Sequence, residues 1–170
     1  MATSVSSKIG VDLNNPSSTA LFGLGDETLG TQGSEWTYCI ATGTLTTGQL
    51  VAIFPNGTAF AFTTALLNGG EVAGTTGNLN LGAIQCNCPQ GQYAWVARKG
   101  VDLYVATTGT IAPLAVGFSP TAGGLIVASS VAVGQTAAGI FITTSASTAT
   151  AATAKATLQY PRPVAGIPQA

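Results

Sequence analysis

The sequence of 170 residues contains no histidine, and this absence removes several classes of active site. Without an imidazole the chain cannot build a Ser-His-Asp or Cys-His catalytic set, or a zinc site that uses histidine. Charged side chains are also scarce, at 6% of the chain with a formal net charge of −1. Five Lys and Arg against six Asp and Glu leave no basic stripe for nucleic-acid phosphates. We therefore expect neither an enzyme nor a nucleic-acid partner.

Cysteines and long apolar runs are few as well. Three cysteines are an odd number and too few for a fold built on disulfides, which favours a protein made in a reducing cytosol. No apolar run reaches the ~18 residues of a membrane-spanning helix, so no membrane partner is expected. Residues 1–8 also lack the basic end and apolar block of a signal peptide.

The scarce charges are unevenly distributed, since residues 36–70 and 103–154 contain none. The solubility of a free monomer usually depends on interspersed charges, so this composition is typical of a subunit that is packed against neighbours. The alternative is a surface of serine, threonine and small residues, which is polar without being charged. Of the two, the sequence favours the assembled state.

Residues 1–34 are predicted to form an extended N-terminal arm, because glycine and polar residues interrupt every apolar run there. Leu21, Phe22 and Leu24 are its apolar anchors, which we expect to contact a partner. Residues 35–160 are predicted to form one all-β domain, a single barrel or sandwich, since turn signals recur every ~8–12 residues.

Individual strands follow from period-two patterns between turn signals. In residues 36–41, large side chains occupy one face and small ones the other, as expected of a half-buried strand. Asn56-Gly57 predicts a tight hairpin, because this pair readily takes positive φ angles. Strands are expected at residues 36–41, 49–54, 59–64, 79–86, 92–98, 101–107, 111–118, 124–130, 138–144 and 155–160.

The C-terminal part is less regular. Residues 145–156 are rich enough in alanine for a helix, but their Ser and Thr content favours a loop or an edge strand. Pro161 and Pro163 cannot donate ladder hydrogen bonds, so they are expected to end the last strand. Residues 161–170 are therefore predicted to be a short C-terminal tail.

Two sets of residues could carry chemistry. Cys39, Cys86 and Cys88 lack the fourth ligand of a zinc site, so we expect buried thiols that fill space, with no metal and no cofactor. The carboxylates are expected to be solvated or to form local ion pairs, since none is predicted to lie in an aromatic cleft. They are Asp12, Asp26, Glu27, Glu35, Glu71 and Asp102.

The aromatic and basic residues leave alternatives open. Trp36, Tyr93 and Trp95 could form a sugar-binding platform, but large aromatics in a chain of small residues are more often packing units of a core or an interface. Arg98-Lys99 is either a solvated strand end or a small cationic patch that faces a partner. The candidates for capsid or subunit contacts are Leu21, Phe22, Leu24, Trp36, Tyr93, Trp95 and Arg98.

A series of short motifs over residues 21–163 resembles the head decoration, or cement, proteins of tailed bacteriophages, which are small β-rich virion proteins. In chain order these motifs are Leu29-Gly30-Thr31, Gly33-Ser34-Glu35-Trp36-Thr37-Tyr38, Leu45-Thr46-Thr47-Gly48-Gln49-Leu50-Val51-Ala52-Ile53, Gly82-Ala83-Ile84, Gly91-Gln92-Tyr93-Ala94-Trp95-Val96, Pro113-Leu114, Thr121-Ala122-Gly123-Gly124-Leu125 and Tyr160-Pro161-Arg162-Pro163.

The resemblance implies a non-enzymatic protein, made in the host cytoplasm, that binds the outer surface of the capsid. Its partners would be the major capsid protein and further copies of itself, commonly as a homotrimer, and a terminal arm would clamp adjoining capsid subunits. Two other functions remain open from the residues. The chain could be a tail, baseplate or adhesion module, or a cellular carbohydrate-binding module that uses the three aromatics named above.

Overall fold

The computed structural model describes residues 11–62, 80–108, 116–118, 125–127, 136–144 and 152–164. Glu71 and the greater part of the strands expected at 111–118 and 124–130 lie outside this part. The described residues contain no α-helix, and the all-β prediction is confirmed. Their elements are β1 (Glu27–Leu29), the 3-10 turn η1 (Thr31–Gly33), β2 (Glu35–Ala41), β3 (Leu50–Ile53), β4 (Thr58–Ala61), β5 (Asn80–Ile84), β6 (Tyr93–Thr107), β7 (Val116–Phe118), β8 (Leu125–Val127), β9 (Thr136–Ile142) and β10 (Ala152–Val164).

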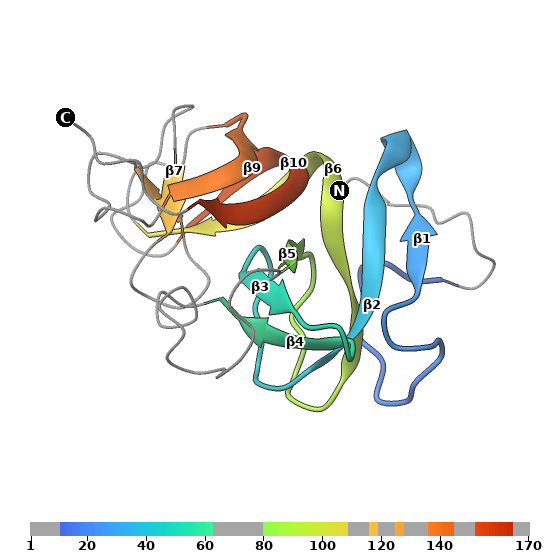
Figure 1. The fold of residues 1–170 in the computed structure, drawn as a ribbon. Helices are drawn as coiled ribbons and strands as arrows, with labels where there is room; N and C mark the ends of the chain where they lie inside the picture. The colour runs from blue at the N-terminus through green and yellow to red at the C-terminus, as the bar shows by residue number, and fades with distance from the viewer. Residues whose placement is uncertain are drawn as a thin grey trace.

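Five strands close into a barrel in the order β2-β4-β3-β5-β6, and pairing between β6 and β2 completes the ring (Figure 1). The β2–β4 pair is parallel and the other four pairs are antiparallel. The predicted hairpin joins β3 to β4, and Gly57 at its turn has a φ of 77°. β1 extends the sheet beyond the barrel by pairing with β2.

β6 is a 15-residue strand that leaves the barrel and continues into a second group of strands, β10, β9, β7 and β8 (Figure 1). The sequence predicted two strands here, at residues 92–98 and 101–107. They are one strand with an irregularity in the middle, where Gly100 has a φ of 150° and Asp102 a φ of 55°. The bend in β6 lets one strand belong to both groups.

β10 overturns the prediction that the last strand ends before Pro161. It runs from Ala152 to Val164, and its pairing with β6 stops at Gln159 while its pairing with β9 continues. Pro161 and Pro163 lie two residues apart, so both missing N–H groups face the same edge of the strand. Because β6 no longer pairs there, the prolines cost no ladder hydrogen bond.

The barrel encloses small and medium-sized side chains. All five barrel strands contribute to this cluster, which is why we place it inside the ring. A ring of five strands is narrower than the eight-stranded barrels that side chains just fill, so it accepts few large residues. The cluster is Cys39, Ala41, Leu45, Val51, Ile53, Ala59, Ile84, Cys86, Cys88, Ala94 and Val96.

A second core lies outside the barrel wall and holds the large side chains, including Trp36, Tyr38 and Trp95. Strands β9 and β10 cover part of it, and the described N-terminal residues cover another part. Leu13 is buried there, and the backbones of Ser17 and Tyr93 exchange two hydrogen bonds of 2.8 Å. Residues 11–34 are therefore packed on their own barrel instead of extending away from it.

Candidate functional site

Two of the predicted contact residues, Trp36 and Trp95, are buried, with 1% and 2% of their surface exposed. The Trp36 indole N–H donates to Ser34 Oγ at 3.0 Å, and the Trp95 ring centroid lies 5.0 Å from that of Tyr38. These rings fill the core outside the barrel wall. Of the two roles predicted for these rings, packing in a core is found for Trp36 and Trp95, and a capsid or subunit contact by them is wrong. The sugar-binding platform that needed both rings is not formed.

Phe22 and Tyr93 are half-buried and complete the same aromatic cluster. The Phe22 ring meets Tyr38 edge-on at 5.4 Å and Trp95 at 5.3 Å, while Tyr93 stacks on Tyr38 at 5.9 Å. Such pairs contribute about 0.5–1.5 kcal/mol beyond the burial of their area. Phe22 therefore fastens residues 11–34 to the chain's own barrel, and little of its ring remains for a partner.

Leu21 and Leu24, the other two predicted anchors, are 62% and 44% exposed. Leu24 lies against the β3–β4 turn, since a Cβ built on Gly57 would be 2.5 Å from the Leu24 Cβ. The adjoining strand β4 carries Phe60, which is also exposed and packs edge-on against Phe54. We call Leu21, Leu24 and Phe60 the arm–hairpin face.

The sequence analysis missed the contribution of Phe60. Because Phe60 and Phe62 are two residues apart, a strand at residues 59–64, as the sequence predicted, would place both rings on one face. β4 ends at Ala61, and Phe62 turns into the core while Phe60 stays at the surface. The exposure of the two rings differs because β4 ends between them.

The basic pair Arg98-Lys99 lies where β1, β2, β6 and β10 meet. Arg98 Nη1 donates to Glu27 Oε1 and Lys99 Nζ donates to Glu35 Oε1, each at 2.8 Å. The Tyr160 hydroxyl donates to the other oxygen of Glu35, and its ring lies under both cations at 5.5 and 5.7 Å. Local ion pairs, one of the two states predicted for the carboxylates, are thus found at Glu27 and Glu35.

Protonation in this charged cluster follows from its hydrogen bonds. The hydrogen bonds from Lys99 and Tyr160 lower the pKa of Glu35, and the same carboxylate raises the pKa of Lys99 and of Tyr160. Glu35 is therefore ionised at neutral pH and Tyr160 protonated, which suits neither for general acid or base work. The cluster joins strands that are far apart in the sequence.

The three cysteines are buried free thiols, as predicted. Burial raises the pKa of Cys39 and of Cys86 to about 12, and it raises the pKa of Cys88 as well. A protonated, enclosed thiol is a poor nucleophile. Within the part of the chain that the structure describes, no group of three His, Cys, Asp or Glu could hold a metal ion.

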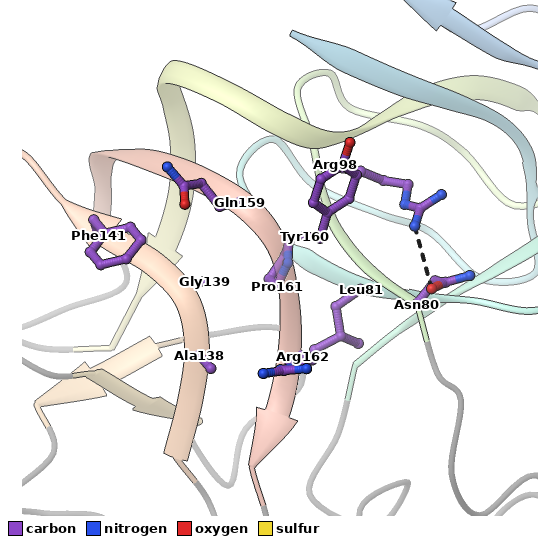
Figure 2. A pocket seen from close by; sticks show the side chains of 10 residues that line it. All are labelled: Asn80, Leu81, Arg98, Ala138, Gly139, Phe141, Gln159, Tyr160, Pro161 and Arg162. Carbon is purple, nitrogen blue, oxygen red and sulfur yellow. Dashed lines mark hydrogen bonds between the residues drawn. The ribbon is translucent and has the colours of Figure 1, made fainter.

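Two hollows on the described surface are large enough to consider as binding sites. One, of about 840 Å³, lies beside the N-terminal residues, and several of its polar groups already form hydrogen bonds within the fold. The Asp12 carboxylate accepts from Asn14 N and Asn15 Nδ2, and the Gln85 amide pairs with both backbone groups of Tyr104. The other, of about 790 Å³, lies between the barrel and strands β9 and β10, with Arg98 and Arg162 in its lining (Figure 2).

Comparison of the sequence with protein-family models found no matching family, and a search of curated proteins found no match. Among the described residues, no helix has the length and apolar character needed to cross a bilayer. The arm–hairpin face and the hollow between the barrel and β10 are therefore the features from which a function can be argued.

Proposed function

We propose that this chain is a non-enzymatic structural protein of a tailed-phage virion that binds the outer surface of the head. It stabilises the head by bridging major capsid subunits, and it associates with further copies of itself, as a homotrimer. The resemblance of residues 21–163 to head decoration proteins supports this role. The scarcity of charge agrees with it, because a subunit held among neighbours needs less charge for solubility.

The observation that carries the proposal is the arm–hairpin face. Leu21 and Leu24 stand exposed on a segment that Phe22 and β1 hold against the barrel. A fixed segment loses little conformational freedom when it binds, so more of its apolar contact energy becomes affinity. Many copies on one lattice strengthen weak single contacts further, because each oligomer engages several sites at once.

This geometry changes how an arm would act. A clamp made of residues 11–34 would meet the capsid as part of a folded body, with two exposed leucines as its contacts. Deleting residues 1–30 would also remove the buried Leu13 and the strand β1, so a loss of binding after that truncation would have two causes. Substitution of exposed side chains separates binding from folding.

The location of the protein is tested first, by labelling intact particles from the source lysate with an antibody to residues 36–160. We expect label over the whole head. Label confined to the tail would replace the proposal with a tail, baseplate or adhesion role. Protein that stays in the soluble fraction, with no labelled particles, would contradict any virion role.

The contact is tested with the double variant Leu21→Ser and Leu24→Ser, added back to heads that lack the protein. Two leucines that become buried in an interface contribute ~1.5–3 kcal/mol each, so we expect at least tenfold weaker binding. Leu29→Ser is the matched control, since Leu29 is equally exposed but lies at the far end of β1. Equal binding by the double variant and the control would remove the arm–hairpin face from the proposal.

A further inference from the structure

The hollow between the barrel and β10 has two walls from different parts of the chain. Asn80 and Leu81 of β5 and Arg98 of β6 form one wall, and Arg162 projects from β10 on the other (Figure 2). Its volume of about 790 Å³ lies within the range of sites that hold small ligands or short peptide segments.

The backbones of β10 and β9, which line this hollow, are irregular. The pairing of β10 with β9 shifts register between Leu158 and Arg162, and Tyr160 inside the shift has a φ of 48°. On the opposite strand only glycine fits at position 139, because φ is 78° there and a side chain would collide with the Gln159 carbonyl oxygen. A tyrosine in the left-handed region is strained, and such strain concentrates at functional sites.

Hydrogen-bond donors with spare capacity gather in the lining. Arg98 Nε is buried without a hydrogen-bond partner, and Arg162 is exposed and has no ion-pair partner among the described residues. The Asn80 side-chain oxygen accepts from Arg98 Nη2 at 3.4 Å, so its amide nitrogen can still donate. Because Arg98 Nε is enclosed, a ligand in the hollow would not reach that atom.

The charge of the lining has one sign. Arg98 and Arg162 line the hollow and no Asp or Glu does, although the chain as a whole is acidic by one charge. Glu27 lies beside Arg98 and binds its Nη1, which offsets part of this charge. This small excess of positive charge suits one carboxylate better than a run of phosphates, because a run of phosphates needs several cations.

Apolar surface borders the same donors. Phe141 of β9 is 56% exposed at the rim of the hollow, whereas Leu81 and Pro161 line it but are buried. Arginine also forms bidentate pairs with carboxylates. We propose that the hollow binds an acidic peptide segment of a partner protein, with an Asp or Glu side chain held by Arg162 and Arg98 and an apolar neighbour on Phe141.

This site depends only on residues of this chain, so it holds or fails independently of the head-binding role. The test titrates the ¹⁵N-labelled full chain with the blocked peptide acetyl-Ala-Leu-Asp-Phe-Ala-amide and follows the arginine Nε–H signals by NMR. We expect saturable shifts at Arg98 and Arg162, with binding weakened about tenfold when the peptide carries Asn in place of Asp.

The variant Arg162→Gln should weaken the Asp peptide about tenfold while the amide spectrum away from β10 stays unchanged. Lys155→Gln is the matched control, because it removes one positive charge from the same strand outside the hollow, and it should bind as the unmodified chain does. Unchanged binding by Arg162→Gln, equal binding of the Asn peptide, or no saturation up to about 5 mM would overturn the proposal. Acetate that binds as tightly as the peptide would also overturn it, in favour of a small carboxylate ligand.

Discussion

Replacing Phe22 by alanine measures how firmly residues 11–34 are held on the barrel. The Phe22 ring is half-buried and contacts Tyr38 and Trp95 at 5.4 and 5.3 Å. A fully buried Phe→Ala change costs about 3–5 kcal/mol, so half that burial gives a loss of ~2 kcal/mol. For a domain of this size, such a loss lowers Tm by about 4–8 °C.

The assay is equilibrium unfolding in urea, followed by tryptophan fluorescence and repeated as a thermal melt. Trp95 is a direct reporter, because the substitution removes one of its ring contacts. Leu21→Ala is the matched control: Leu21 is the preceding residue and 62% exposed, so its replacement should change the free energy of unfolding by less than ~0.5 kcal/mol.

Equal changes in the free energy of unfolding for Phe22→Ala and Leu21→Ala would refute this reasoning. Residues 11–34 would then not be packed on the barrel in solution. The proposed head contact would then be made by a loose arm, because the barrel would not hold Leu21 and Leu24 in place. A loss of ~2 kcal/mol for Phe22 alone agrees with the packed segment.

Three further results are expected. In urea unfolding, Gly57→Ala should lower the free energy of unfolding by at least ~1 kcal/mol more than Gly91→Ala does. Both glycines have a positive φ, but only a Cβ at Gly57 would meet Leu24. Equal losses for the two variants would contradict that contact. The lowered pKa of Glu35 gives stability that is present above the unfolded pKa of ~4.5 and lost as pH falls below it. Glu35→Gln should therefore flatten the fall in stability between about pH 5 and pH 3, and an unchanged pH profile would show that the ion pair adds nothing. Finally, with thiol pKa values raised to about 12 at Cys39 and Cys86, a disulfide reagent at pH 8 should label the cysteines only after unfolding; rapid labelling of the native protein would contradict their burial.

Local signals in the sequence were sufficient for the strands of the barrel. The alternation of large and small residues in 36–41 and the Asn56-Gly57 turn act over a few residues, and both are found in β2 and the β3–β4 hairpin. The alternation of large and small residues did not predict which face of β2 points into the barrel. Both faces of this strand are buried, with small residues inside the barrel and Trp36 and Tyr38 outside it.

The prolines near the C-terminus show the limit of a local rule. Pro161 and Pro163 end a strand only where both edges carry partners, and the sequence does not reveal that β6 leaves β10 at Gln159. The exposed state of Phe60 likewise depended on the strand ending at Ala61. In each case the missing information was the position of a neighbouring strand.

The sequence alone determined the all-β class and the burial of the three thiols, because composition and period-two patterns act through local geometry and burial. Tertiary structure decided which charges meet: Glu27 with Arg98 and Glu35 with Lys99, 71 and 64 residues apart. It also brought Arg98 and Arg162 to one hollow. Contacts between distant strands depend on sheet order and register, and the closure of the barrel sets both.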